Sequence, residues 1–292
     1  MSAEAQLATL QPADYKSDLK PVWCAGCGDY GALAALHRAM AKLQLAPWNT
    51  VVISGIGCSS RLPGYVSTYG FNGVHGRALT LASGVKVARP ELNVIAVGGD
   101  GDGIAIGGNH FLHAARRNLD IAYFMMDNEI YGLTKGQAAP TTPLGDKTKS
   151  TAYGNPEAAV DPCALAISFG ASWVARGFSG DVKGTTELMK QAIQHRGFAF
   201  LNVMSPCVTW RGDDQFKILR AKVRPLPAGH DATNREAALR FTNETEIMTT
   251  GVLYSVERPT LVDEILEVRW KAQGDKQPPT RTEMLAAFTP NF

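Results

Sequence analysis

The sequence lacks several features that would assign it at once to a large class of proteins. Its 292 residues include only 5 cysteines and carry a formal net charge of +2, from 29 basic and 27 acidic residues. Because no stripe of clustered lysine and arginine with interleaved aromatic residues is present, nucleic acid is not an expected partner. No segment approaches the roughly 18 uninterrupted apolar residues of a membrane-spanning helix, and residues 1–20 lack the apolar core of a secretory signal. We therefore expect a cytoplasmic protein without membrane contact.

The sequence does contain a regular alternation of two hydrophobic patterns. With 45% hydrophobic residues, the chain is long enough to bury a sizeable core. Short β-rich runs are found at 51–53, 94–97, 121–126, 173–175 and 198–204. Between them, apolar residues recur at helical spacing, around 33–43, 79–87, 111–115, 165–169 and 188–193. This alternation predicts an α/β fold, a parallel sheet with helices on both faces.

Four motifs follow four of these strands directly. They are Gly57-Cys58-Ser59, Gly99-Asp100-Gly101, Asp127-Asn128 and Pro206-Cys207. In parallel α/β sheets the ligand site lies outside the carboxyl ends of the strands. We therefore expect the four motifs to converge on one edge of the sheet and to form one site.

Two parts of the chain lack a clear period. Residues 137–162 are rich in proline, threonine, glycine and alanine and are predicted to form a long loop, of the kind that often serves as a lid or contact surface. Beyond residue 210 the pattern weakens, so we divide the chain into a domain at 1–210 and a C-terminal extension at 211–292. In the extension, Thr260 and Asp263 have the spacing of a capping box that starts a helix. We expect the extension to contact a partner subunit; packing on its own domain is the open alternative.

Asp100 and Asn128 predict a magnesium diphosphate site. Mg²⁺ prefers oxygen ligands and is usually held by one or two protein groups together with phosphate oxygens. The Asp100 carboxylate and the Asn128 amide oxygen would supply two ligands from neighbouring strand ends, and a backbone carbonyl near Ile130 a third. The glycines allow backbone N–H groups to approach a diphosphate, and a helix starting near Gly108 would direct its positive end toward it.

Four of the five cysteines are spaced as a Cys-x-x-Cys pair and two distant single residues: Cys24, Cys27, Cys58 and Cys207. In a cytoplasmic protein thiols stay reduced, so this spacing indicates metal binding and not disulfides. Structural zinc also accepts four cysteines, but its sites usually bring two close pairs. Cys163 lies at the start of an apolar helical segment and is predicted to be a buried, small hydrophobic residue.

Several motifs together resemble the β subunit of the 2-oxoacid:ferredoxin oxidoreductases. Gly99-Asp100-Gly101 with Asn128 is similar to the thiamine diphosphate signature of that family. The resemblance extends to Trp23-Cys24-Ala25-Gly26-Cys27-Gly28, Gly55-Ile56-Gly57-Cys58-Ser59-Ser60, His75-Gly76-Arg77-Ala78 and Tyr131-Gly132-Leu133-Thr134-Lys135-Gly136-Gln137. It covers roughly residues 20–210, with the motifs in the order of the family.

The resemblance implies a set of cofactors and ligands in domain 1–210. Cys24, Cys27, Cys58 and Cys207 would ligate one [4Fe–4S] cluster, and Asp100, Asn128 and the Ile130 carbonyl would hold Mg²⁺. Contacts with thiamine diphosphate would come from Ile56, Gly57, Ser59, His75, Gly101, Asp102, Gly132 and Leu133. Without the resemblance, the favoured interpretation of His75 is a hydrogen-bonded core histidine.

The resemblance also implies partners and a reaction. The glutamate that activates the thiamine ring would come from an α subunit, in an αβ or (αβ)₂ assembly. A 2-oxoacid would lose CO₂, two electrons would pass singly through the cluster to ferredoxin, and the acyl group would pass to coenzyme A. Before contact with a partner, this chain would then hold half an active site.

The prediction of the 2-oxoacid rests on one arginine and one motif. An arginine offers a bidentate fork for a carboxylate, and Arg61 follows Cys58 closely, which together with the 131–137 motif favours 2-oxoglutarate. Lys135 is a second candidate, for that carboxylate or for coenzyme A; a surface salt bridge is the structural alternative for each. Other hypotheses are a pyruvate or broad-range enzyme of the family, a non-redox thiamine-dependent decarboxylase with structural zinc, and a zinc-stabilised interaction subunit.

Overall fold

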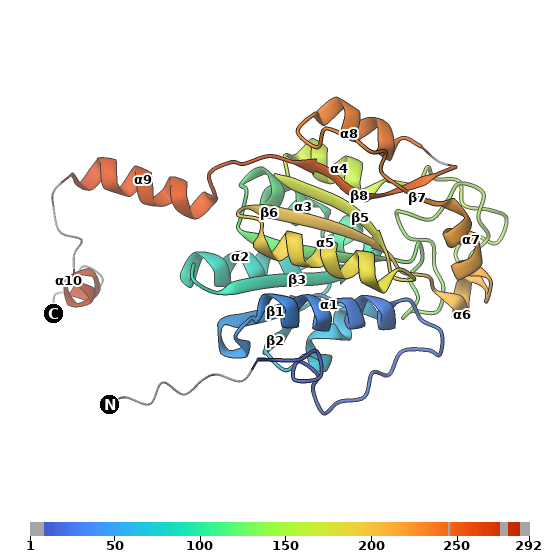
Figure 1. Cartoon of the computed structure of the whole chain (residues 1–292), viewed down its shortest axis with the longest axis horizontal. Helices are drawn as coiled ribbons and strands as arrows, with labels where there is room; N and C mark the ends of the chain where they lie inside the picture. The colour runs from blue at the N-terminus through green and yellow to red at the C-terminus, as the bar shows by residue number, and fades with distance from the viewer. Residues whose placement is uncertain (1–8, 245, 275–279, 287–292) are drawn as a thin grey trace.

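An eight-stranded sheet forms the centre of the protein, with the strand order β2-β1-β3-β4-β6-β5-β8-β7. The computed structural model describes residues 9–244, 246–274 and 280–286 (Figure 1). The strands are β1 (Thr50–Ser54), β2 (Tyr69–Asn72), β3 (Asn93–Gly99), β4 (Ile121–Asp127), β5 (Trp173–Phe178), β6 (Phe198–Met204), β7 (Val223–Pro225) and β8 (Met248–Ser255). All five predicted strands are confirmed, as β1, β3, β4, β5 and β6.

Strands β1 to β6 pair in parallel, as predicted. Every residue of β1, β4 and β6 is buried, which explains their uninterrupted runs of apolar residues. At one side of the sheet β8 pairs antiparallel with β5, so the sheet is mostly and not wholly parallel. Strand β8 is only partly buried and β2 is fully exposed. Neither strand therefore needs the hydrophobic run by which the buried strands were recognised.

Helices cover both faces of the sheet. On one face α1 (Asp29–Leu43) packs against α5 (Val182–Gln194). On the other lie α2 (Ala78–Ala88), α3 (Gly108–Arg116), α4 (Pro162–Phe169) and α8 (Arg235–Thr242). The two faces have separate hydrophobic cores, which meet only across the strands. The two-faced α/β architecture is thus the predicted one.

The long loop predicted at residues 137–162 is confirmed, since no strand or helix lies between β4 and α4. Its end is determined by local chemistry. The carboxylate of Asp161 accepts a hydrogen bond from the Ala164 N–H (2.8 Å), and Pro162 occupies the first helical turn, where no N–H is needed. Gly170 ends α4 in the left-handed conformation.

The C-terminal extension has two structurally different parts. Its first part contributes α6 (Val208–Arg211), α7 (Gln215–Lys222) and α8, and its strands β7 and β8 continue the central sheet. Its second part contains α9 (Leu261–Gln273) and α10 (Arg281–Ala286), and α9 projects away from the body of the protein (Figure 1). The predicted capping box of α9 is confirmed, because Thr260 and Asp263 bond each other's backbone N–H groups. The division of the chain at residue 210 stays a prediction.

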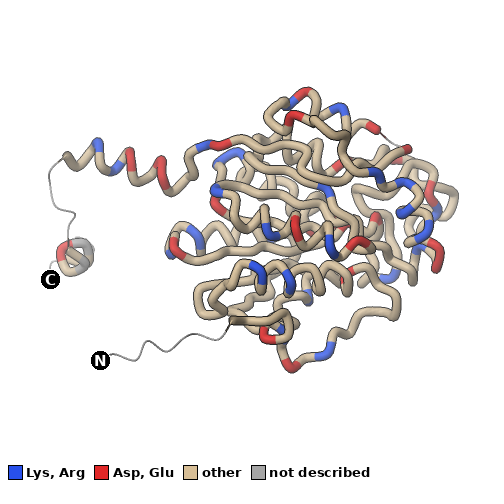
Figure 2. Tube along the Cα trace, viewed as in Figure 1, with Lys and Arg blue, Asp and Glu red and all other residues tan. Residues whose placement is uncertain are grey.

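Along the Cα trace, the positions of basic and acidic residues are spread over the helices and loops with both signs mixed (Figure 2). This distribution agrees with the absence of a basic stripe in the sequence. Among the described helices, none combines the length and the apolar character needed to cross a lipid bilayer.

Candidate functional site

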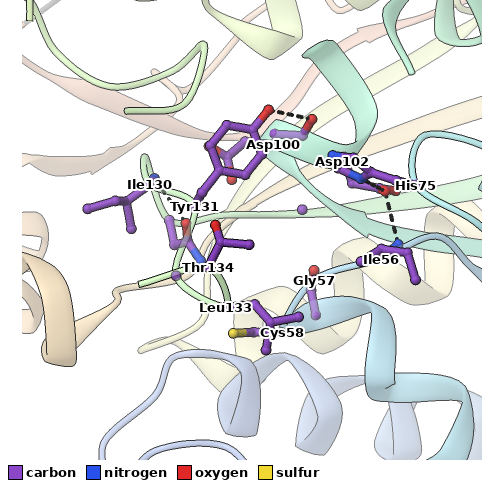
Figure 3. A pocket seen from close by; sticks show the side chains of 15 residues that line it. Ile56, Gly57, Cys58, His75, Asp100, Asp102, Ile130, Tyr131, Leu133 and Thr134 are labelled. Carbon is purple, nitrogen blue, oxygen red and sulfur yellow. Dashed lines mark hydrogen bonds and ion pairs between the residues drawn. The ribbon is translucent and has the colours of Figure 1, made fainter. Parts of the chain in front are cut away.

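A cavity opens at the carboxyl ends of β1, β3 and β4, where the sequence predicted a site (Figure 3). It is lined by every residue predicted to contact the diphosphate cofactor or Mg²⁺: Ile56, Gly57, Ser59, His75, Asp100, Gly101, Asp102, Asn128, Ile130, Gly132 and Leu133. Four separate loops contribute these residues. The structure therefore brings the predicted set together, while the role of each residue as a ligand stays a prediction.

Asp102 holds two of these loops in place. Its Oδ1 atom lies 2.7 Å from Nδ1 of His75 and accepts hydrogen bonds from the N–H groups of Ile56 (3.0 Å) and Gly76 (2.8 Å). The side chain is buried, and a Cβ at Gly55 would lie 2.1 Å from its Oδ2 atom. Its observed contacts are thus with the protein, and they fix His75 at the wall of the cavity.

Asp100 is a buried carboxylate beside a second one. Its Oδ2 atom accepts a hydrogen bond of 2.6 Å from the hydroxyl of Thr141, on the long loop. Burial, and after it the neighbouring charge of Asp127, raises the pKa of Asp100 well above its usual value. Two carboxylates in such a position are poorly compensated by the protein alone, and a divalent cation would compensate them.

The turn at Asn128, Glu129 and Ile130 has an unusual backbone. Glu129 adopts φ +58°, a left-handed conformation that residues with a Cβ rarely take. The Ile130 N–H donates to Oδ1 of Asn128 (3.1 Å), and the Thr142 hydroxyl donates to the Glu129 carbonyl (2.6 Å). The strained residue thus lies between the two predicted metal ligands of this turn.

Tyr131, Thr134 and Thr141 are site residues that the sequence did not single out. Tyr131 and Thr134 line the cavity, and the Tyr131 hydroxyl donates to the Gly101 carbonyl at 3.2 Å. A Cβ at Gly101 would lie 2.2 Å from the Tyr131 ring, so only glycine fits there. Tyr131 belongs to the 131–137 motif, which could have indicated it, whereas Thr141 lies in a loop without any periodic signal.

The predicted helix near Gly108 is confirmed as α3, and its expected role toward a diphosphate stays a prediction. A short wide helical turn, Gly101–Ile106, separates α3 from strand β3. The cavity is lined by Gly99, Asp100, Gly101 and Asp102, and not by the first residues of α3. The backbone N–H groups nearest to a bound diphosphate would therefore be those of the turn.

The cysteine segments are joined to one another beside this cavity. The Gly28 N–H donates to the carbonyl of Pro206 (3.0 Å), which ties the Cys-x-x-Cys turn to the segment of Cys207. The indole N–H of Trp23 donates to the Cys58 carbonyl at 2.7 Å. A Cβ on Gly132 would lie 3.5 Å from Sγ of Cys207 and 3.7 Å from Sγ of Cys58. These thiols therefore border the cavity wall.

The thiols share a partly buried environment. Cys24 is exposed, and Cys27, Cys58 and Cys207 are partly buried. Burial raises the pKa of these three thiols, that of Cys58 to about 11, and the charges of Asp29 and of neighbouring thiols add to the effect. Thiolates in this environment need a positive centre beside them.

The described residues contain no group of three or more His, Cys, Asp or Glu side chains arranged to hold a single metal ion. The four cysteines come from three segments that meet beside the cavity, and both the iron–sulfur cluster and the structural-zinc alternative stay predictions for this set. Cys163 is fully buried in the core, as predicted.

Arg61 lines a second cavity of about 390 Å³ that adjoins the first. The two cavities share Ile56, Gly57 and Leu133 in their walls. Arg61 is exposed, and its positive charge lies close enough to the Cys58 thiol to lower the pKa of that thiol, against the larger effect of burial. Lys135, the other candidate for a substrate carboxylate, lines neither of these two cavities.

Two family models match the chain. Residues 55–203 match the C-terminal TPP-binding domain of thiamine pyrophosphate enzymes, and residues 207–269 match the C-terminal part of the pyruvate ferredoxin oxidoreductase beta subunit. The first match contains most of the cavity, and the second begins at Cys207.

Curated proteins with similar sequences include two from archaea. The 2-oxoacid:ferredoxin oxidoreductase 1, subunit beta, of Aeropyrum pernix is 47% identical over 204 residues, which are 70% of this chain and 64% of that protein. The chain thus matches less than two thirds of the length of that relative. The 2-oxoglutarate synthase subunit KorB of Methanocaldococcus jannaschii is 36% identical over 265 residues, which cover 88% of this chain and 96% of that protein.

Among solved structures, the chain is similar to one of a 2-oxoglutarate:ferredoxin oxidoreductase from Magnetococcus marinus with 2-oxoglutarate, coenzyme A and succinyl-CoA bound. The TM-score is 0.91 at 40% sequence identity, and the match covers 98% of each chain. The similarity therefore includes the projecting C-terminal part as well as the sheet.

Proposed function

The chain belongs to the family of 2-oxoacid:ferredoxin oxidoreductase β subunits, and from this premise we propose the reaction of which it forms part. The enzyme interconverts 2-oxoglutarate, coenzyme A and oxidised ferredoxin with succinyl-CoA, CO₂ and reduced ferredoxin. One observation carries the proposal: Cys58 and Gly132 belong both to the wall of the diphosphate cavity and to the surroundings of the thiols. Electrons leaving a cofactor in that cavity would have a short path to an iron–sulfur cluster.

The residues fit the two metal centres that the proposal requires. Asp100, the amide oxygen of Asn128 and the Ile130 carbonyl would hold Mg²⁺ with a diphosphate, and the hard oxygen donors match this ion. Cys24, Cys27, Cys58 and Cys207 would hold the [4Fe–4S] cluster. The mutual pKa-raising effect of the buried thiols supports this assignment, because a cationic iron centre stabilises them as thiolates.

Thiamine diphosphate, when bound, supplies an electron sink for the loss of CO₂. The contribution of this chain is to bind and orient. Asp102 fixes the ring of His75 through Nδ1, which leaves Nε2 as the free ring nitrogen toward the cofactor. Tyr131 packs over Gly101 and closes one wall of the cavity against water.

An α subunit is required because the chain does not provide the activating carboxylate. No glutamate is among the residues that line the cavity in the described part of the chain. Expressed alone, the chain is expected to bind cofactor without turnover, and activity should appear only with the α subunit. Robust activity of this chain by itself would contradict the two-subunit proposal.

Helix α9 is the surface that we assign to the α subunit. Its side chains are largely exposed, with Leu266 at 56%, Val268 at 63% and Trp270 at 71%. Covering such side chains contributes roughly 1.5–3 kcal/mol each, and the family to which the chain belongs functions as a complex. Deleting residues 261–292 should therefore abolish co-purification of the α subunit and leave the thiol cluster in place. Unchanged co-purification would contradict this assignment.

Arg61 is the residue that we assign to the distal carboxylate of 2-oxoglutarate. It lies in the cavity next to that of the cofactor, and a guanidinium binds carboxylates in a bidentate manner. In the assembled enzyme, Arg61→Ala should lower turnover of 2-oxoglutarate relative to pyruvate by about tenfold or more, the loss of one charge-assisted hydrogen-bonded contact. An unchanged ratio of the two activities would contradict the assignment.

The test of the reaction itself uses the assembled enzyme under anaerobic conditions. We expect reduction of ferredoxin that depends on 2-oxoglutarate, coenzyme A and added thiamine diphosphate together. Decarboxylation without ferredoxin reduction by a colourless protein would favour the non-redox alternative. The reduced thiols that the cluster requires also lead us to propose a cytoplasmic location.

A further inference from the structure

We propose that Arg211 is a positioning residue that joins helix α6, which directly follows Cys207, to the turn of Asn128, Glu129 and Ile130. The thiol cluster and the diphosphate cavity would then move as one unit. This inference rests on the function proposed for the cavity, and it adds a residue that lies outside the cavity wall.

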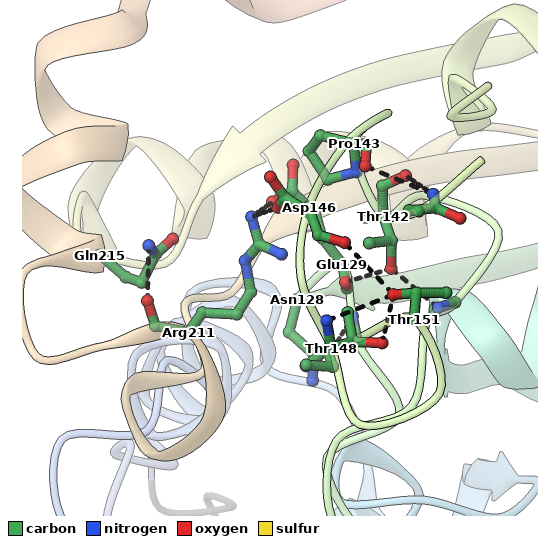
Figure 4. Close-up of polar contacts among 12 residues, drawn as sticks. Asn128, Glu129, Thr142, Pro143, Asp146, Thr148, Thr151, Arg211 and Gln215 are labelled. Carbon is green, nitrogen blue, oxygen red and sulfur yellow. Dashed lines mark hydrogen bonds and ion pairs between the residues drawn. The ribbon is translucent and has the colours of Figure 1, made fainter. Parts of the chain in front are cut away.

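The ion pairs of Arg211 connect three segments that are distant in sequence (Figure 4). Its Nη2 atom lies 2.9 Å from Oε2 of Glu129 and 2.9 Å from Oδ2 of Asp146. The side chains of Arg211 and Glu129 are only 13% and 14% exposed. A charge pair this sheltered is screened less by solvent and salt than a surface pair, so its geometry is held more firmly.

One end of this connection reaches a cysteine directly. Helix α6 starts after Cys207, and the Arg211 N–H donates to the Cys207 carbonyl at 3.0 Å. Gln215 donates through Nε2 to the Arg211 carbonyl at 2.9 Å, which extends the support into α7. A displacement of the Arg211 side chain would therefore act on the backbone that carries the Cys207 thiol.

The other end reaches the predicted metal ligands. Glu129 is the residue with φ +58° between Asn128 and Ile130, and such a backbone persists only where its surroundings hold it. On the main-chain side the hydroxyl of Thr142 binds the Glu129 carbonyl. On the side-chain side the partner is Arg211. The Glu129 N–H also donates to Oδ1 of Asp127 (3.2 Å). Arg211 is thus the anchor of the Glu129 side chain, beside two anchors of its main chain.

The residue before Arg211 makes a second connection to the same loop. A Cβ at Gly136 would lie 2.9 Å from the ring of Trp210, and Nζ of Lys149 lies 4.6 Å from the centre of that ring. The Lys149 N–H in turn donates to the Gly136 carbonyl at 2.9 Å. Because Trp210 and Arg211 both contact the loop after Asn128, helix α6 is held to this loop at two points.

An arginine suits this position better than a lysine. Its planar guanidinium keeps a fixed direction while binding two carboxylates, whereas an ammonium group on a flexible stem does not. The Nε atom of Arg211 is buried without a hydrogen-bond partner among the described residues. The orientation in which Arg211 contacts Glu129 and Asp146 therefore leaves its Nε–H group without an acceptor.

The experiment compares two buried ion pairs at opposite ends of the sheet in the full chain. Arg211→Met removes the proposed connection, and Lys86→Met removes the control pair, in which Nζ of Lys86 lies 2.6 Å from Asp120 with 8% exposure of the lysine. We measure the affinity for thiamine diphosphate with Mg²⁺ by calorimetry and the EPR spectrum of the reduced protein. Arg211→Met should weaken binding by about 10–100-fold, the range for loss of groups that hold a metal site in place from outside its ligands, and should alter the EPR spectrum. Lys86→Met should lower thermal stability and leave both unchanged.

The outcomes separate this inference from the proposed function. If the wild-type chain binds no thiamine diphosphate with Mg²⁺, the proposed function is wrong. If it binds and Arg211→Met binds equally well, the positioning role is wrong. Arg211→Lys keeps the positive charge and should recover part of the lost affinity, and equal loss in the Lys and Met variants would contradict the role of the ion pairs. Should Arg211→Met fail to fold, Glu129→Gln removes the same pair, and its unchanged affinity would overturn the inference.

Discussion

The two ends of the central sheet differ in how well their buried polar groups are compensated. At the carboxyl end, Asp100 lies beside Asp127, and three partly buried thiols have a raised pKa. Glu129 has a left-handed backbone there. None of these features stabilises the folded chain by itself.

At the amino end, a buried asparagine has all its polar atoms satisfied within the chain. Asn118 is fully buried, and its Oδ1 atom accepts hydrogen bonds from the Ser172 hydroxyl (2.6 Å) and the Phe198 N–H (2.9 Å). Its Nδ2 atom donates to the carbonyls of Arg258 (3.1 Å) and Pro259 (3.0 Å). This network joins two strands to the start of the C-terminal helix region.

The difference indicates which end carries function. Groups that are costly in the empty protein become favourable when a cation or cofactor is bound, whereas a complete hydrogen-bond network contributes to stability alone. Substitutions at the carboxyl end should therefore remove ligand binding, and those at the amino end should remove stability.

The largest expected effect is the loss of the cluster in Cys58→Ser. A serine hydroxyl at this position does not provide the thiolate that iron prefers. Visible absorbance of the anaerobically purified protein should fall to near the baseline, and ferredoxin reduction should be abolished. Cys163→Ala is the matched control, since Cys163 is buried in the core. Its absorbance should be unchanged, and equal loss in both variants would remove the distinction between the two classes of cysteine.

A second large effect is expected for Asp100→Asn. Removing a charged oxygen ligand should weaken binding of thiamine diphosphate with Mg²⁺ by about 100-fold, or ~2.7 kcal/mol. The same change relieves repulsion from Asp127, so the midpoint of thermal unfolding without ligand should rise or stay the same. Calorimetry and thermal unfolding measure the two results. A lower unfolding midpoint with unchanged affinity would show that Asp100 contributes to stability and not to ligand binding.

Asn118→Ala should lower stability and leave ligand binding nearly unchanged. It leaves several buried groups without partners, at roughly 1–3 kcal/mol for each, and it places alanine at φ +49°. We expect the free energy of unfolding to fall by about 3 kcal/mol, measured in urea. Affinity for thiamine diphosphate with Mg²⁺ should stay within about twofold of the wild type, a difference of ~0.4 kcal/mol. A loss of affinity as large as that of Asp100→Asn would show that the two ends are not independent.

The smallest expected effect is a pH dependence at the amino end. Burial lowers the pKa of His195, partly offset by Asp120 and Glu257, and its Nε2 atom lies 2.7 Å from the Ser172 hydroxyl. Because the folded form takes up a proton less readily than the unfolded form, stability is lost as the pH falls below the unfolded histidine pKa of about 6.5. The unfolding midpoint should decline between about pH 7 and 5, and less so in His195→Gln. Parallel declines in both proteins would assign the effect to other groups.

Much of the fold followed from the sequence because buried parallel strands require continuous apolar runs. The convergence of Asp100, Asn128 and Cys58 also followed, since each comes directly after such a strand. Strands β2, β7 and β8 could not be recognised, because short or exposed strands leave no such pattern. The strands with which they pair depend on the tertiary structure and not on a local sequence pattern.

The supporting residues of the site were much harder to predict than its ligands. Thr141 and Thr142 lie in an irregular loop, and they reach Asp100 and Glu129 only through the folded course of that loop. Arg211 lies in a polar stretch where an arginine carries no signal of burial. Such contacts between distant segments depend on tertiary structure and not on local spacing.

The central claim is that the four thiols next to the diphosphate cavity hold an iron–sulfur cluster. Its most direct test is metal and sulfide analysis of the anaerobically purified chain together with EPR of the reduced protein. We predict iron and acid-labile sulfide in equal amounts, with the EPR signal of a reduced [4Fe–4S] cluster that is absent from Cys58→Ser. A colourless protein that contains stoichiometric zinc and no sulfide would contradict the account.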